Sequence, residues 1–176
     1  MKNSIKYLIA IPLFIHFACS QSGKWKPKIT KETVDSVNRT KVPSEDWEGI
    51  VKIKMEKKDG VYQVPIWVND VKMHFIFDTG AGMVSISETE VNFLIKEGSL
   101  TEEDYLGSAN FMDANGDVTE GSIINLKSIK IGNRTLYNVK ASVVHNLNAP
   151  LLLGQTVLEK FGKISIDNNA GEITLE

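Results

Sequence analysis

The fold of this 176-residue sequence is decided by the stretch Phe75-Ile76-Phe77-Asp78-Thr79-Gly80-Ala81-Gly82. An apolar strand delivers one carboxylate to a tight, glycine-rich turn, and strand texture resumes at Met83 to Ile86. An ordinary turn also uses Asp and Gly in this way, because Asp bonds its own backbone and Gly supplies unusual dihedral angles. The surrounding pattern must therefore decide between a plain turn and a functional site.

Strand patterns flank this stretch on both sides. Residues 51–55 alternate apolar and charged, as a half-buried strand does, and turn signals such as Asp59-Gly60 and Asn115-Gly116 separate the apolar runs. We expect strands at 51–55, 62–68, 72–77, 123–131, 136–144, 151–153, 163–167 and 172–175.

Two short segments have helical spacing instead. Ser87 and Glu90 form a capping box at the start of one helix, whose apolar face consists of Val91, Leu94 and Ile95 and which can end at Gly98. A second helix is expected at 155–161. Thr101 with Asp104 indicates a further short helical turn. No long βαβ alternation is present, so the sequence predicts a mostly antiparallel, β-rich barrel with two short helices.

Composition excludes several function classes. The formal net charge of -2 and the pI near 6.0 give no electrostatic reason to expect nucleic acid as a partner. Cys19 is the single cysteine, so no intramolecular disulfide can form. The histidines and Cys19 show no metal-ligand spacing, and Gly80-Ala81-Gly82 lacks the third glycine of a dinucleotide fingerprint. We therefore expect neither a metal nor a cofactor.

The N-terminus has the pattern of a targeting segment. Lys2 and Lys6 precede an apolar stretch, 8–18, that is too short to span a bilayer. Ala18-Cys19 resembles the cleavage site of a bacterial lipoprotein signal, although His16 and Phe17 depart from the usual residues. We expect a signal peptide at 1–18, a flexible tether at 19–48 and one folded domain at 49–176.

This arrangement predicts an exported protein of the cell envelope, anchored in the membrane by lipid at Cys19, on the periplasmic or surface side. Plain secretion is the alternative. Trp47 can belong to the start of the folded unit.

A second signal makes the pattern around Asp78 specific. Leu151-Leu152-Leu153-Gly154 is an apolar strand that opens the helix at 155–161. Asp-Thr-Gly-Ala after a strand, followed later by large aliphatics and Gly before a C-terminal helix, resembles the retropepsin-like aspartic peptidases. Between the two, residues 113–118 resemble the flap hairpin of bacterial members. The resemblance covers 50–176 and implies the closed β-barrel of the acid-protease fold.

The resemblance also implies an activity, the hydrolysis of peptide bonds by a pair of Asp78 carboxylates. Two carboxylates that share one proton can act as base toward water and as acid toward the carbonyl oxygen. The chain has a single Asp-Thr-Gly, so the second carboxylate must come from a second copy, in a homodimer formed through the active site. A barrel retained as a non-catalytic binding or assembly module of the envelope is the alternative.

The remaining roles follow from the same resemblance. Thr79 would brace the two loops, Gly80 would let the substrate backbone approach closely, and Ala81 would border the cleft. Leu153 and Gly154 would support the loop from beneath. The flap would consist of Ala114, Asn115, Gly116 and Asp117, with Asn115-Gly116 at its mobile tip.

Overall fold

The computed structural model describes residue 47 and residues 49–112 and 115–176. The expected signal peptide, Cys19, nearly all of the expected tether and Ala114 lie outside these residues. No helix in the described ranges is long and apolar enough to cross a membrane.

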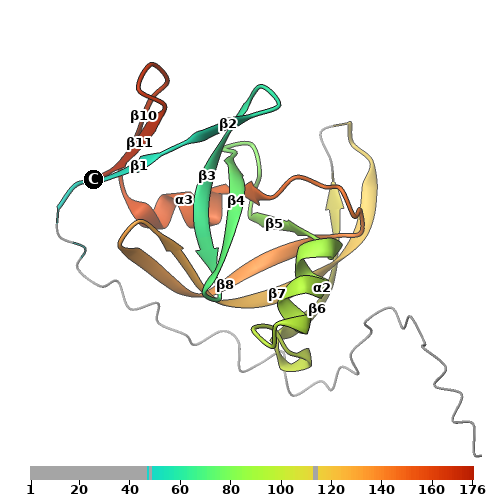
Figure 1. Cartoon of the computed structure of the whole chain (residues 1–176). Coiled ribbons are helices and arrows are strands. Elements are labelled where there is room, and N and C mark those ends of the chain that lie inside the picture. The colour runs from blue at the N-terminus through green and yellow to red at the C-terminus, as the bar shows by residue number, and fades with distance from the viewer. Residues whose placement is uncertain (1–46, 48, 113–114) are drawn as a thin grey trace, which may run out of the picture.

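A closed barrel forms the centre of the molecule (Figure 1). Its strands hydrogen-bond in the ring order β3-β4-β9-β5-β8-β7, and β7 returns to β3 through Trp67↔Lys130 and Val68↔Ile129. The pairings β4–β9 and β5–β8 are parallel and the others are antiparallel. The expected mostly antiparallel closed barrel is therefore confirmed. The bounds are β3 Val61–Val68, β4 Val71–Phe77, β5 Val84–Ser87, β7 Val118–Ile131, β8 Arg134–Val144 and β9 Leu152–Leu153.

Two strands extend the barrel sheet at its ends, and neither was expected from the sequence. They are β2 (Glu56–Lys58), which pairs with β3, and β6 (Tyr105–Met112), which pairs with β7. All three β2 residues are charged and exposed, and β6 contains Gly107 and Asn110, residue types that are depleted in strands. Each strand therefore forms because its hairpin partner pairs with it.

A separate sheet joins the two ends of the folded chain. Its order is β1-β11-β10, with β1 at Val51–Lys54, β10 at Ile164–Asp167 and β11 at Glu172–Leu175. All its pairs are antiparallel.

The hairpin of β2 and β3, in the barrel sheet, turns at Asp59 and Gly60, which both have positive φ (51° and 83°), as a two-residue hairpin turn requires.

The expected helices are present. Helix α2 spans Glu88–Lys96, with Ser87 Oγ accepting a hydrogen bond from Thr89 N and with Val91 and Leu94 buried. Helix α3 (Gln155–Leu158) continues into a 3-10 turn at Glu159–Phe161, and another 3-10 turn lies at Glu102–Asp104.

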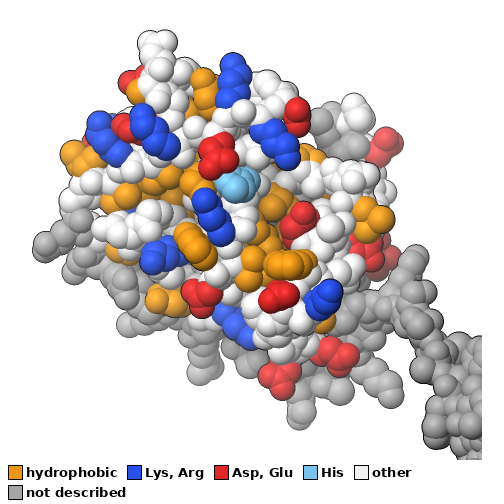
Figure 2. Space-filling model, in the orientation of Figure 1, with side chains coloured by type: hydrophobic (Ala, Val, Ile, Leu, Met, Phe, Trp, Pro, Cys, Tyr) orange, Lys and Arg blue, Asp and Glu red, His pale blue; other side chains and the backbone are white. Residues whose placement is uncertain are grey.

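The space-filling view of one face shows apolar side chains between scattered acidic and basic side chains, without a large patch of one charge (Figure 2).

Arg134 binds the first and last segments of the folded domain to the barrel. This side chain is 3% exposed and donates from Nη1 to the carbonyl of Phe161 (2.9 Å) and from Nη2 to that of Gly49 (2.8 Å). Nη2 also lies 3.2 Å from the carbonyl oxygen of Leu175. Trp47 stacks on Phe161 with ring centroids 5.2 Å apart. The packed unit therefore includes Trp47.

Candidate active site

Asp78 directly follows the last residue of β4, at the end of the barrel. Strand β4 pairs in parallel with β9, in the register Ile76↔Leu152 and Phe77↔Leu153. Beyond the last paired residue, the backbone N–H of Asp78 donates to the carbonyl oxygen of Leu153 at 3.2 Å. The sheet therefore fixes the backbone of Asp78 directly, and the loop begins only after it.

The carboxylate of Asp78 organises its own turn. Its Oδ1 accepts a hydrogen bond from the backbone N–H of Gly80 at 2.8 Å, and its carbonyl oxygen accepts one from Ala81 N at 3.4 Å. Asp78 and Ala81 are half-buried, whereas Thr79 and Gly80 are exposed. The turn thus presents an exposed surface next to a carboxylate that is held in place on one side.

The start of α3 holds the far side of the loop. The backbone N–H of Gln155 donates to the carbonyl oxygen of Ala81 (2.8 Å), and Thr156 N donates to that of Gly82 (3.1 Å). The first N–H groups of a helix have no partner within the helix, so these bonds satisfy donors that would otherwise be unpaired. Leu153, fully buried, lies before this helix. The structure therefore brings Leu153 and Gly154 together with the Asp78 loop.

The expected flap is the turn of a long hairpin. Strands β6 and β7 pair up to Met112↔Val118, and Asn115, Gly116 and Asp117 lie in the turn between them. Gly116 has a positive φ of 89°. In Figure 1 the tip of this hairpin and the loop between β4 and β5 both lie at the upper end of the barrel.

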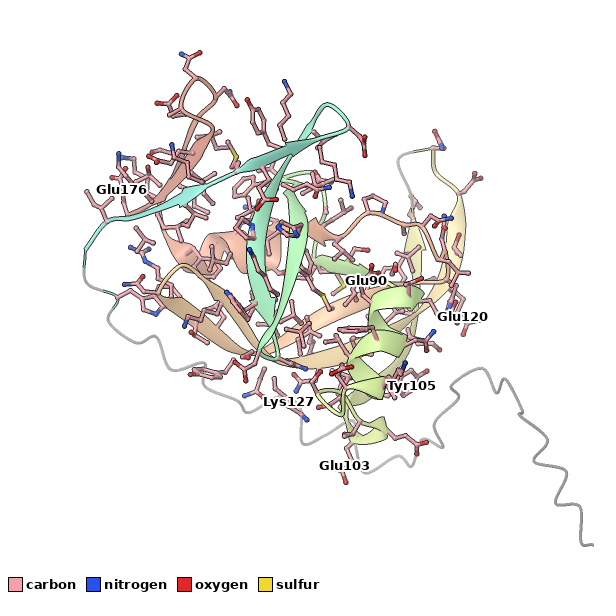
Figure 3. The ribbon with its side chains drawn as sticks, in the orientation of Figure 1. Glu90, Glu103, Tyr105, Glu120, Lys127 and Glu176 are labelled. Atoms are coloured by element: carbon pink, nitrogen blue, oxygen red, sulfur yellow. The ribbon has the colours of Figure 1, made fainter. Side chains whose placement is uncertain are left out.

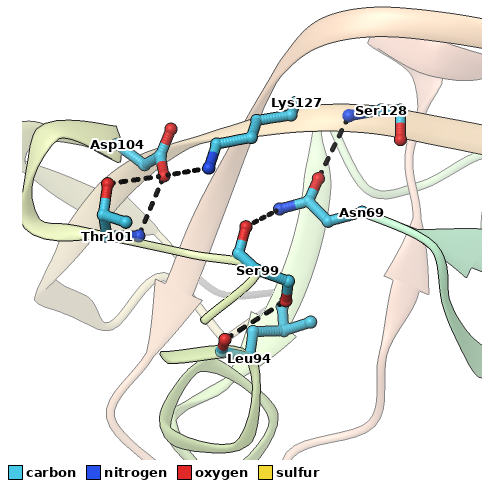
Figure 4. A network of polar contacts seen from close by, with 7 residues as sticks. All are labelled: Asn69, Leu94, Ser99, Thr101, Asp104, Lys127 and Ser128. Carbon is cyan, nitrogen blue, oxygen red and sulfur yellow. Dashed lines mark hydrogen bonds and ion pairs between the residues drawn. The ribbon is translucent and has the colours of Figure 1, made fainter. Parts of the chain in front are cut away.

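A buried polar network anchors the base of the hairpin (Figure 4). The Asn69 side chain is 7% exposed, donates to the carbonyl of Ser99 at 3.0 Å and accepts from Ser128 N at 3.1 Å. Lys127 on β7 pairs with Asp104 (3.4 Å), which caps the turn before β6. The contacts of Asn69 join the β3–β4 turn to β7 and to the segment that follows α2, and the Lys127–Asp104 pair joins β7 to the turn before β6. The sequence indicated the short helical turn of Thr101 and Asp104, but not the contacts of Asn69 with Ser99 and Ser128.

Because β6 was not predicted, the side chains that this strand adds to the hairpin, Asn110 and Met112 among them, were not among the predicted site residues. Apolar-polar alternation is weak there, and only the Asn115-Gly116 turn indicated a hairpin. Within the described ranges, no group of three or more His, Cys, Asp or Glu residues could hold a metal ion. The ionisable side chain that the loop at 78–83 carries is the carboxylate of Asp78.

Comparisons with known proteins agree with this geometry. The sequence model of the family described as gag-polyprotein putative aspartyl protease matches residues 64–160. A curated protein of Rickettsia prowazekii (strain Madrid E), the uncharacterized protein RP867, is 31% identical over 131 residues, which are 73% of this chain and 54% of that protein. The chain thus spans about half the length of this relative.

A solved structure has the same fold. The crystal structure of a retropepsin-like aspartic protease from Rickettsia conorii matches with a TM-score of 0.51 and 24% sequence identity, covering 72% of this chain and 89% of that one. This likeness supports the retropepsin-like barrel that the sequence predicted.

Proposed function

The chain belongs to the family of gag-polyprotein putative aspartyl proteases, and on that basis we propose that it is an aspartic endopeptidase with Asp78 as its catalytic carboxylate. One observation carries the proposal. Asp78 is the residue at which β4 leaves the barrel, with its backbone bonded to Leu153 and its Oδ1 bonded to Gly80 N. A carboxylate held in this way can meet a reacting group without reorganisation of the loop.

The reaction needs two carboxylates. One ionised Asp78 takes a proton from water, which then attacks the peptide carbonyl carbon, while a protonated Asp78 donates its proton to the carbonyl oxygen. The negative charges of two adjacent carboxylates repel each other, so they hold one proton between them over the working pH range. When the C–N bond breaks, the Asp78 that took the proton of the water gives it to the leaving nitrogen, and the other Asp78 takes a proton from a hydroxyl group of the intermediate. The products are a carboxylic acid and an amine, and the pair again holds one proton.

The second Asp78 comes from a second copy of the chain. Thr79 and Gly80 are exposed in one subunit, so a partner related by a two-fold axis can meet them without rearrangement of the barrel. In that assembly Thr79 contacts its counterpart, Gly80 and Ala81 border the bound peptide, and Leu153 with Gly154 supports the loop. The flap at 114–117 closes over the peptide and excludes water.

Substrate and location complete the proposal. The enzyme acts on peptides or proteins outside the cytoplasm and is held at the membrane by lipid on Cys19. The support for this part is the pattern of Lys2, Lys6, the short apolar stretch and Ala18-Cys19.

The test compares wild-type chain with Asp78→Asn on a peptide library, with cleavage products read by mass spectrometry. We expect wild-type protein to cleave and the variant to lose hydrolysis by at least about a hundredfold, with an unchanged circular dichroism spectrum. Hydrolysis by Asp78→Asn at the wild-type rate would refute the assignment. A wild-type dimer that binds peptides without cleaving them would favour the binding-module alternative.

A further inference from the structure

The β6–β7 hairpin continues the barrel wall, so its register shows which of its side chains face inward. Within the barrel, the paired residues Ile124 and Ala141 are both fully buried. Paired residues share a face, and successive residues of a strand alternate between faces. The pairing of β7 with β8 runs without a shift from Ser122 to Leu126. The inward face therefore continues along β7 through Ser122, Glu120 and Val118.

Strand β6 supplies the other half of this face. Its residues Ser108, Asn110 and Met112 pair with Ser122, Glu120 and Val118 respectively. The opposite face is filled by its own hairpin, because the Phe111 ring lies only 3.0 Å from where a β-carbon on Gly121 would be. The inward face stays open, with Met112 72% and Val118 59% exposed.

The inward face has apolar side chains next to the turn and the carboxylate of Glu120 two residues further along β7. Met112 and Val118 are nearest the turn, and Glu120 with Asn110 forms the next pair on the same face. The tip lies at the same end of the barrel as the Asp78 loop (Figure 1). A peptide held between loop and hairpin would therefore meet apolar side chains first and Glu120 beside them.

The charge of Glu120 is not compensated by any residue that the structure describes. Within the described ranges its carboxylate has no hydrogen bond or ion pair, whereas Glu172, Glu176 and Asp104 each pair with lysine. The sequence segments that would frame the cleft, 78–95, 97–126 and 144–158, contain no lysine or arginine. These segments therefore supply no cation to Glu120, and a bound molecule can supply one.

We propose that Glu120 is a specificity-determining residue that selects peptides carrying lysine or arginine close to an apolar cleavage site. This inference rests on the proposed peptidase function. An ammonium or guanidinium group donates charge-assisted hydrogen bonds to the carboxylate, while acidic substrate residues are repelled by it. A two-fold dimer carries one Glu120 on each side of the scissile bond, so basic residues are favoured on both sides.

The experiment profiles cleavage of a proteome-derived peptide library by the full chain. Three proteins are compared: wild type, Glu120→Gln and Glu103→Gln. Glu103 is a matched control because it loses the same charge in the turn before β6, at the end of the hairpin away from its tip (Figure 3). Synthetic peptides with lysine, glutamine or glutamate beside one cleaved apolar pair then give kcat/KM at low and high salt.

We expect wild type and Glu103→Gln to prefer lysine over glutamine by about two- to fivefold in kcat/KM at low salt, the range of an exposed ion pair. The preference should shrink at high salt and vanish in Glu120→Gln. Cleavage without enrichment of basic residues, or equal enrichment in Glu120→Gln, would overturn the inference and leave the peptidase function standing. Absence of all cleavage by wild type would instead overturn the peptidase function, and this inference with it.

Discussion

The α-carbon of Gly154 lies so close to the carbonyl of Met83 that a β-carbon there would stand 2.2 Å from that oxygen, and 2.8 Å from the carbonyl oxygen of Ala81. Both contacts are with backbone atoms, which cannot swing aside as the end of a long side chain can. The entrance of α3 and the Asp78 loop therefore fit together only if residue 154 has no side chain.

Gly154→Ala should consequently displace the loop that carries Asp78. We expect a loss of about 3 kcal/mol in the free energy of unfolding and loss of peptide hydrolysis, measured by urea denaturation and by cleavage assay. Gly82→Ala is the matched control in the same loop, because a β-carbon there meets nothing within 4 Å. A change of less than about 0.5 kcal/mol is expected for it. Equal effects of the two substitutions would contradict this account of the loop.

Arg134 should be required for stability. Arg134→Met leaves the buried carbonyl oxygens of Phe161 and Gly49 without their donor, so we expect a loss of about 3 kcal/mol in the free energy of unfolding. Lys140→Met, at an exposed position on the same strand, should change it by less than about 0.5 kcal/mol. Urea midpoints for both variants provide the measurement, and a wild-type midpoint for Arg134→Met would refute the clamp.

The pairing of Lys52 with Glu172 should make stability depend on pH. The hydrogen bond from Lys52, which outweighs an opposing effect of desolvation, lowers the pKa of Glu172 below 4.5. A lowered carboxylate pKa contributes stability above the unfolded pKa, and the contribution fades as the pH falls through the folded pKa. Wild type should therefore be more stable than Lys52→Gln at pH 6, with the difference closing below pH 4.5. A difference that persists unchanged at pH 3 would argue against the pairing.

The proposed anchor makes its own prediction. The mature chain should begin at a lipid-modified Cys19 and fractionate with membranes, and Cys19→Ser should abolish the modification. A single acyl chain binds membranes only marginally, so stable retention requires more than one. Mass spectrometry of the purified N-terminus is the measurement. An unprocessed Met1 terminus on protein from the cytoplasmic fraction would disprove export.

Much of the barrel could be predicted from the sequence because its elements follow local rules. The strands at 62–68 and 72–77 carry strong apolar patterns, Asp59-Gly60 marks a hairpin, and Ser87 with Val91 and Leu94 marks the start and inner face of α2. The Asp78 loop was located by a motif in which a strand, a carboxylate and glycines follow in order.

The missing parts depend on contacts between distant residues. Strand β6 has little propensity of its own, and it forms because β7 pairs with it. The barrel closes where Trp67 on β3 pairs with Lys130 on β7, and neither local sequence pattern indicates this pairing. Glu120 could not be distinguished from other exposed carboxylates until the register showed which face of the hairpin it shares with the barrel interior.

The central claim is that two copies of Asp78 form one catalytic pair, and specific activity across a dilution series tests it most directly. Analytical ultracentrifugation on the same samples gives the fraction of dimer. We predict that activity falls in proportion to that fraction and that inactive Asp78→Asn protein, added in excess to wild type, suppresses activity by forming mixed dimers. Full specific activity from a demonstrated monomer, with no suppression by the variant, would contradict the claim.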